Sequence, residues 1–314
     1  MSFQAINKAY SETFKPGRLS LGIFVPIENH AYSAVPTMQH HLQRVQLVEE
    51  LGFSAVWLRD VPFNVPTFGD AGQIFDPFVY LGYLAGNTSR IALGVSSIVL
   101  PLRHPAHVAK AAASADVLSG GRILLGVASG DRPEEYPAFN RPFDSRGESF
   151  RSSIDYIRNS WGNSQGFTNA FGSPGPGIDL IPKPTSGKLP LLITGSSRQS
   201  PEWLAHNGDG WITYPRRIDS QAAIITDWRK RMDEAGIADK PAMQSLYIDL
   251  QEDPHAPLRP IHLGFSSGVN ALRSYLKELQ TIGINHVGLN LRFNKADIGT
   301  TLKRLAKEIL PYFN

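Results

Sequence analysis

Short apolar runs alternate with longer amphipathic segments along most of the chain. The short runs are typical of strands buried on both faces, and the longer segments repeat apolar residues with a helical period. This alternation predicts βα units and a parallel sheet. The predicted strands are 19–25, 54–59, 91–100, 122–129, 189–195, 208–214, 243–250 and 284–291. The predicted helices are 38–51, 76–86, 104–118, 145–161, 201–207, 219–235, 268–282 and 298–310.

One segment breaks the alternation. Residues 162–188 are rich in Gly, Pro, Ser and Asn, which predicts a long surface excursion. A Pro-rich loop is expected between 250 and 268. No shift in composition divides the remaining strands and helices into two units. The sequence therefore predicts a single (β/α)₈ barrel over residues 1–314, with an insertion around 162–188.

In such a barrel, functional residues lie at the C-terminal ends of the strands. The sequence GGRILLGVASGD (120–131) covers one of these ends. It lacks the Gly-Lys-Ser/Thr ending of a phosphate loop, the Gly-x-Ser-x-Gly spacing of a nucleophile elbow and the register of a dinucleotide fingerprint. Gly126 and Gly130 would allow another backbone or a flat ligand to approach closely. The candidates at the barrel mouth are Pro26, Arg59, Asp60, Ser96, Ser97, Ala128, Ser129, Gly130, Asp131, Ser196, Ser197, Tyr214, Asp249, Asn290 and Arg292.

Composition excludes several classes of protein. The chain has no cysteine, which excludes disulfides and thiolate chemistry and suits a reducing cytoplasm. The formal net charge is only +3, and the basic clusters are short, so nucleic-acid binding is not expected. The first residues lack the apolar core of a signal peptide, and no apolar run is long enough to cross a bilayer. We expect a soluble cytoplasmic protein.

Three kinds of site chemistry compete at the mouth. Asp60, Asp131 and Asp249 could form an oxygen-only metal site, although no histidine follows a strand closely. No strand end carries the lysine that a Schiff-base enzyme needs. The stretch 193–201, ITGSSRQSP, combines small hydroxyl residues, a glycine and Arg198 at a helix N-terminus, which favours an anion site. Ser200 is also a suitable N-cap with a proline after it, and both roles can hold together.

Three segments make the chain recognisable: GFSAVWLRD, the long block DPFVYLGYLAGNTSRIALGVSSIVLPLRHPAHVAKAAASADVLSGGRILLGVASG, and PLLITGSSRQSPEWLAHNGDGW. The most specific features are Leu-Pro-x-Arg-His-Pro and the Asp-x-Leu-Ser-x-Gly-Arg that follows it. With these motifs, the chain resembles the bacterial-luciferase-like flavin monooxygenase family over nearly its whole length. The resemblance implies a (β/α)₈ barrel that binds FMN, or in some relatives a deazaflavin, at its C-terminal mouth.

The resemblance also implies roles for individual residues. In the family, a non-proline cis peptide after strand three supports the flavin ring, and here it falls at Ser96–Ser97 or one bond further on. The family's phosphate contacts map onto Arg146, Ser197 and Ser200, in agreement with the anion site that includes Arg198. Ala128 and Ser129 would face the flavin, and Arg59 and Asp60 are the candidate catalytic residues. The histidine and the reactive cysteine of the light-emitting members fall at Val61 and Ala128, which argues against light emission.

The expected activity is that of a monooxygenase that uses reduced FMN and O₂ to oxidise a small organic substrate. No GxGxxG loop for NAD(P)H is present, so a separate flavin reductase is expected as a partner. We also expect a homodimer, from family analogy and the apolar segment Phe75–Tyr83. Two alternatives remain: a flavin-binding protein without turnover, and a metal-dependent barrel hydrolase that uses Asp60, Asp131 and Asp249.

Overall fold

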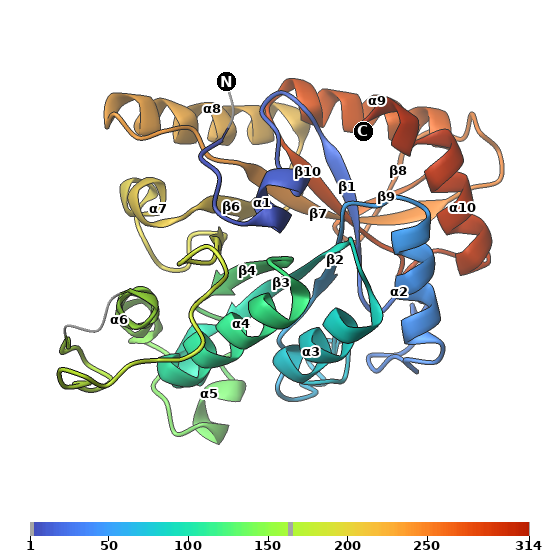
Figure 1. Cartoon of the computed structure of the whole chain (residues 1–314). Helices are drawn as coiled ribbons and strands as arrows, with labels where there is room; N and C mark the ends of the chain where they lie inside the picture. Colours follow the sequence, from blue (N-terminus) through green and yellow to red (C-terminus); the bar gives the residue numbers. More distant parts are fainter. Residues whose placement is uncertain (1–2, 163–165, 314) are drawn as a thin grey trace.

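Eight parallel strands close into a barrel in the computed structural model, which describes residues 3–162 and 166–313 (Figure 1). The strands follow one another in chain order, and the last strand pairs with both the first and the seventh, which closes the sheet. This arrangement confirms the predicted (β/α)₈ barrel. The barrel strands are β1 (Ser20–Phe24), β2 (Ala55–Leu58), β3 (Ala92–Val99), β4 (Ile123–Ala128), β5 (Leu191–Thr194), β6 (Gly210–Thr213), β7 (Ala242–Leu250) and β10 (His286–Asn290).

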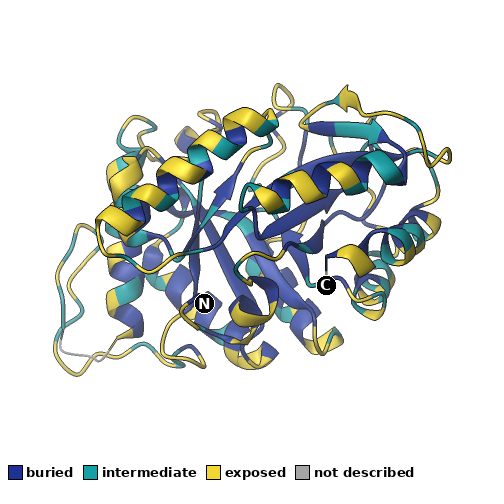
Figure 2. Ribbon diagram, turned by 90° about the horizontal axis from the view of Figure 1, so that it is seen from above, coloured by how far each residue is buried: buried dark blue, intermediate teal, exposed yellow. Residues whose placement is uncertain are grey.

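A helix follows each barrel strand, as the sequence predicts. Figure 2 shows these helices with exposed outer faces around a buried set of strands. Local capping fixes several ends: Asp76 accepts hydrogen bonds from the amides of Phe78 and Val79. No helix in the described part of the chain is both long and apolar enough to span a bilayer. The helices are α2 (His41–Glu50), α3 (Pro77–Asn87), α4 (Pro105–Ser119), α6 (Arg146–Trp161), α7 (Pro201–Asn207), α8 (Ile218–Glu234), α9 (Val269–Thr281) and α10 (Ile298–Glu308).

Besides the 3-10 helices η1 (Leu100–Leu102) and η2 (Leu310–Tyr312), four short elements are additions that the sequence pattern does not predict. Two are the helices α1 (Lys8–Thr13) and α5 (Glu135–Ala138). The others are β8 (Arg259–Ile261) and β9 (Gly264–Ser267), which form a hairpin where a Pro-rich loop was expected. Strand β9 pairs with the second half of β7, so the sheet continues beyond the barrel on this side.

The lower part of the barrel interior is filled by side chains that interlock with glycines. The Trp57 ring occupies the space beside Gly94, where an added Cβ would lie 2.3 Å from the ring. Trp57 Nε1 donates a hydrogen bond to His286 Nε2 at 2.8 Å. Residues of the N-terminal segment pack against this layer, including Tyr10 in α1 and Phe14 directly after it. The barrel is therefore filled at this end.

The excursion at 162–188 is confirmed over its described residues, 166–188, which contain no helix and only one isolated bridge. It lies beside α6 in Figure 1. Lys183 Nζ donates to the carbonyls of Ser160 and Gly162 at 2.9 and 2.8 Å. The Asp116 carboxylate of α4 accepts a hydrogen bond from the Thr185 amide at 2.9 Å. The insertion is thus fastened to the outside of α4 and α6.

Candidate functional site

A cavity of about 710 Å³ opens at the C-terminal ends of the barrel strands. It is the place where a (β/α)₈ barrel carries its functional residues. Its lining includes every predicted catalytic and cofactor-binding residue except Ser200, whereas Pro26 and Asp249, which were also expected at the mouth, are not part of it. The catalytic and cofactor-binding candidates in the lining are Arg59, Asp60, Ser96, Ser97, Ala128, Ser129, Arg146, Ser197 and Arg198.

The cavity exists because the inward-facing residues change from apolar to polar along the strands. On β7, buried Met243 is followed at alternate positions by Ser245 and Tyr247, both of which line the cavity. On β10, Gly288 is followed by Asn290. Successive side chains of a strand alternate between its two faces, so these positions share the barrel interior. The barrel is filled below and open to polar ligands above.

The peptide bond between Ser96 and Ser97 is cis, at the position that the resemblance implies. The ladder between β3 and β4 shifts its register between Val95 and Ile98, at the same place. The Ser97 hydroxyl forms a short hydrogen bond with the Thr194 hydroxyl at the end of β5. The irregular part of β3 is therefore part of the cavity wall.

Gly126 in β4 and Gly130 in the loop after it have different roles. A Cβ on Gly126 would lie 2.3 Å from the Val95 carbonyl oxygen, so this glycine allows β3 to approach closely. Gly130 has a φ of +78°, and a Cβ there would lie 2.7 Å from Val99. The Ser129 carbonyl accepts a short hydrogen bond from the buried Tyr136 hydroxyl. These contacts fix the backbone beside Ala128 and confirm the predicted close approach of backbone at Gly126.

The loop after β5 meets the start of α6, where Arg146 lies. Gln199 Nε2 donates to the Gly147 carbonyl at 2.9 Å, and Arg151 donates to Gln199 Oε1 at 3.2 Å. The Arg146 guanidinium lies 3.5 Å from the centre of the Phe143 ring and donates to the Phe143 carbonyl at 2.8 Å. Its Nε is buried and has no partner within the described residues. An unpaired buried donor in a cavity wall is suited to an anionic ligand.

The backbone of this loop adds further donors. Gly195, Ser197 and Arg198 have φ values of +57°, +44° and +62°. Among the described residues, the amides of Ser196 and Ser197 find no hydrogen-bond acceptor. Successive amides in left-handed conformations form concave anion sites in many proteins. The Ser197 hydroxyl donates to the Thr194 carbonyl at 2.8 Å, so here the backbone is the better candidate.

Ser200 lies outside the cavity lining. Its hydroxyl accepts a hydrogen bond from the Trp203 amide at 3.2 Å, and Pro201 follows at the first helical position. This confirms its role as an N-cap. A contact between Ser200 and a phosphate stays a prediction.

The Asp60 carboxylate is held by several hydrogen bonds from neighbouring groups. It accepts hydrogen bonds from Arg103 Nε and Nη2 at 2.9 and 2.7 Å, and from the Val99 amide at 3.1 Å. Its side chain is 1% exposed. These contacts give Asp60 a structural role between β2 and the end of β3, and its catalytic role stays a prediction.

The three carboxylates of the metal hypothesis do not gather. Asp249 points away from the cavity and accepts hydrogen bonds from Gln251, Ser266 and the Lys295 amide at 2.7, 2.9 and 3.0 Å. Asp131 is exposed at the rim. Within the described residues, no group of three or more His, Cys, Asp or Glu side chains could hold a metal ion. The geometry gives no support to the metal-dependent hydrolase.

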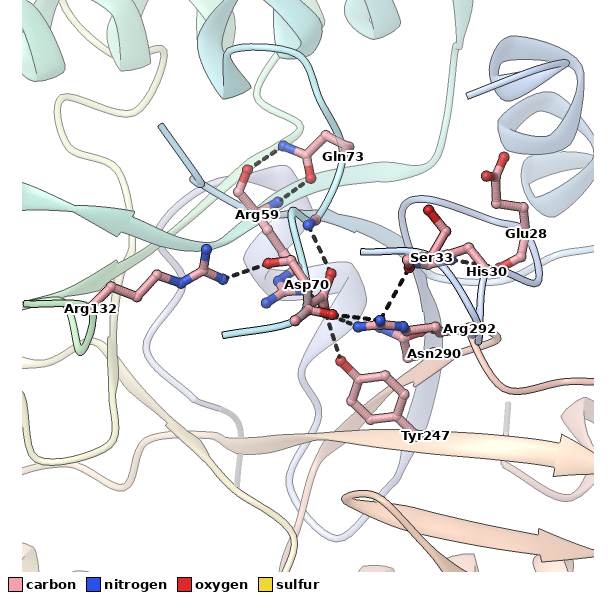
Figure 3. Close-up of polar contacts among 12 residues, drawn as sticks. Glu28, His30, Ser33, Arg59, Asp70, Gln73, Arg132, Tyr247, Asn290 and Arg292 are labelled. Atoms are coloured by element: carbon pink, nitrogen blue, oxygen red, sulfur yellow. Dashed lines mark hydrogen bonds and ion pairs between the residues drawn. The ribbon is translucent and has the colours of Figure 1, made fainter. Parts of the chain in front are cut away.

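A cluster around Asp70 is the main feature that the sequence does not predict (Figure 3). Arg59 Nη1 and Arg292 Nη1 lie 2.5 and 3.0 Å from Asp70 Oδ2. The Tyr247 hydroxyl donates to the same oxygen at 3.4 Å, and Arg132 donates to the Asp70 carbonyl at 3.0 Å. Burial alone would raise the pKa of Asp70, but Arg59, the Gly72 amide and Arg292 lower it to about 2. Asp70 is therefore ionised at neutral pH.

Comparisons with known proteins identify the family of this chain. The family model described as luciferase-like monooxygenase matches residues 19–282, which is most of the barrel. This chain belongs to the luciferase-like monooxygenase family. A family described as monooxygenases argues against the hydrolase alternative.

Curated relatives of this luciferase-like chain are similar over part of their length. The alkanal monooxygenase beta chain of Photorhabdus luminescens is 31% identical over 144 residues, which are 45% of this chain and 44% of the relative. An uncharacterized Mycobacterium tuberculosis protein is 33% identical over 164 residues, which are 49% of this chain and 57% of the relative. The aligned region thus spans about half the length of the curated relatives that the chain matches.

Solved structures share the fold over nearly the whole chain. Monooxygenase RslO1 from Streptomyces bottropensis superposes with a TM-score of 0.79 at 18% identity, covering 94% of this chain and 100% of the other. An F420-dependent secondary alcohol dehydrogenase, in complex with an F420–acetone adduct, gives 0.78 at 16% identity, covering 95% and 99%. The oxygenating constituent of 3,6-diketocamphane monooxygenase from Pseudomonas putida, in complex with FMN, gives 0.71 at 14% identity, covering 95% and 99%.

Proposed function

We propose that this chain is the oxygenating component of a flavin-dependent monooxygenase that uses reduced FMN and O₂ to oxidise a small organic substrate. The observation that carries the proposal is the meeting of two loops in one cavity wall. The buried Nε of Arg146 in α6 and the amides of Ser196 and Ser197 in the β5–α7 loop have no hydrogen-bond partner among the described residues. Together they suit the phosphate of FMN.

Other residues of the cavity would contact the flat flavin ring. Ala128 at the end of β4, Ser129 directly after it, and the cis Ser96–Ser97 peptide on β3 are the residues that the family resemblance assigns to the ring. Arg198 would add a charge near the phosphate. The bound flavin supplies the oxygen chemistry, and the protein positions the ring and the substrate and excludes water.

Binding and oxygen consumption test the proposal. The purified protein is titrated with FMN and with the deazaflavin F420, and oxygen uptake is then measured with chemically reduced FMN in the presence and absence of substrate candidates. We expect FMN to bind and oxygen uptake to rise with an accepted substrate. Preference for F420 without oxygen uptake would make the chain a deazaflavin-dependent oxidoreductase. FMN binding without substrate-coupled uptake would make it a binding protein without turnover.

A separate reductase completes the proposed reaction. We therefore expect NADH alone to leave the bound FMN oxidised over the time of many turnovers. Addition of a flavin reductase with NADH should restore oxygen uptake. Rapid reduction by NADH without the reductase would contradict this part of the proposal.

A further inference from the structure

Three arginines gather on the side of the cavity opposite the proposed phosphate site. In the closed barrel, β10, β1 and β2 lie across from β5. Arg59 follows β2 and Arg292 follows β10, while Arg132 reaches the same place from the loop after β4 (Figure 3). Two carboxylates, Asp70 and Glu135, are paired with these three guanidinium groups, and a third, the exposed Asp131, lines the same cavity.

The three arginines retain unused hydrogen-bond donors. Arg132 is 5% exposed, and its Nη1 has no hydrogen-bond partner within the described residues, because Glu135 lies 3.8 Å away. Arg292 Nε is likewise buried and unpaired in the described structure. Within the described residues, the side chain of Arg59 makes one hydrogen bond, to Asp70. A guanidinium has five donors, so an ion pair that only tethered the 59–76 loop would not need this excess.

The neighbours of these donors are aromatic. The Phe68 ring lies 3.8 Å from the Arg132 guanidinium carbon. Tyr247 packs against His262 of the β8–β9 turn and against Phe293, with ring centroids 5.7 and 5.3 Å apart. Phe68, Tyr247 and His262 all line the cavity. The region thus combines arginine forks, which match planar carboxylates, with flat apolar surfaces.

From this arrangement we infer that the cavity binds a substrate that carries a carboxylate, held by Arg59, Arg132 and Arg292. The inference rests on the proposed function, because it names the class of the organic substrate. The anion would replace the missing partners of Arg132 and Arg292, while Asp70 keeps the three side chains in place. The proposed phosphate site and this carboxylate site lie on opposite sides of the mouth, so both can be filled at once.

The first test uses the wild-type protein loaded with FMN, so that the phosphate site is already occupied. Benzoate and benzamide, which differ in charge but have almost the same shape, are titrated by calorimetry and by the change in flavin absorbance. We expect benzoate to bind about ten- to a hundred-fold more tightly than benzamide. Equal affinity for the two probes would overturn the inference without any variant.

Variants give opposite directions of change. Arg59→Gln and Arg292→Gln should each weaken benzoate binding about ten-fold or more, with FMN affinity unchanged. Asp70→Asn should strengthen it, because the amide oxygen can still accept hydrogen bonds from Arg59 and Arg292 and keep them in place, while the negative charge that competes with the ligand is removed. Arg217→Gln, an exposed arginine that does not line the cavity, is the matched control and should change nothing. Benzoate binding that is unchanged in both arginine variants would overturn the inference.

FMN binding and benzoate binding test two different proposals, the function and the carboxylate site. If the protein does not bind FMN, the proposed function fails, and calorimetry of benzoate and benzamide with the flavin-free protein still tests the carboxylate site. If FMN binds and benzoate does not, the carboxylate inference fails alone. Thermal unfolding of each variant shows whether a loss of binding comes from a loss of the fold.

Discussion

The Asp60 carboxylate receives two hydrogen bonds from the Arg103 guanidinium, at 2.9 and 2.7 Å, and Arg103 also pairs with Asp76 at 2.8 Å. This pair joins the end of β2 to the segment after β3 and to the N-cap of α3. Asp60 also lines the cavity, so an experiment must distinguish a structural role of this carboxylate from a catalytic one.

Asp60→Asn should lower the free energy of unfolding by about 2–3 kcal/mol, less than for a fully buried pair because Arg103 is partly exposed and keeps Asp76. Urea unfolding measures this change. Arg103→Gln breaks the same pair and should cause a similar loss. If Asp60 acts on the substrate, Asp60→Asn alone will abolish turnover while Arg103→Gln retains it.

Arg146→Ala should weaken FMN binding by about ten- to a hundred-fold, because a charged donor to phosphate contributes about 1.5–3 kcal/mol. Riboflavin has no phosphate and should lose much less affinity. Fluorescence titration with both flavins measures the two constants. Equal losses would mean that Arg146 acts through the fold rather than through the phosphate.

Acid should destabilise the protein through His286. Burial lowers the pKa of His286 to about 3, whereas in the unfolded chain it is about 6.5. Between these values the unfolded state binds one more proton, so the contribution of neutral His286 is complete above pH 6.5 and is lost as the pH falls towards 3. The slope is about 1.4 kcal/mol per pH unit.

His286→Gln is the control for this pH dependence, since an amide oxygen can still accept the hydrogen bond from Trp57 Nε1. Chemical denaturation at several pH values between 4 and 7 should give a flatter profile for the variant. The same slope in both proteins would assign the acid sensitivity to other groups.

A homodimer stays a prediction from the sequence, and the surface offers a place for it. Phe75, Val79 and Tyr83 are 38%, 71% and 46% exposed, although they are large and apolar. Light scattering at micromolar concentration should give twice the mass of the chain, and Val79→Glu should shift it towards the monomer. A monomeric wild-type protein would rule out the homodimer.

The barrel could be predicted because its signals are local and repeated. Each strand is a short apolar run, and each helix is a segment in which apolar residues recur with a helical period. Both patterns can be recognised in the local sequence without knowledge of the rest of the fold. The segment Arg259–Ser267 could not be recognised in this way. Its strands are very short, Pro260 argues against a strand, and β9 is fixed by a close approach at Gly264, where a Cβ would lie 1.8 Å from the Tyr247 carbonyl oxygen.

Part of the site could be predicted for a related reason. Residues at strand ends, such as Ser97 and Ala128, are located as soon as the strands are known. Asp70 lies in a long loop without periodicity, and nothing local indicates that it meets Arg132 and Arg292. Their contacts join positions far apart in the chain, so only the folded barrel reveals the cluster.

The nine residues of β7 form hydrogen bonds both with strands of the barrel and with the additional strand β9. The first half pairs with β6 and β10 and closes the barrel, and the second half pairs with β9. His262 and Leu263, which line the cavity, form the turn between β8 and β9. The tip of the hairpin can therefore change in length or composition across evolution without altering the ladder that holds the eight strands together. Barrel closure and the attachment of this part of the cavity wall thus use largely different residues of one strand, which overlap at Tyr247.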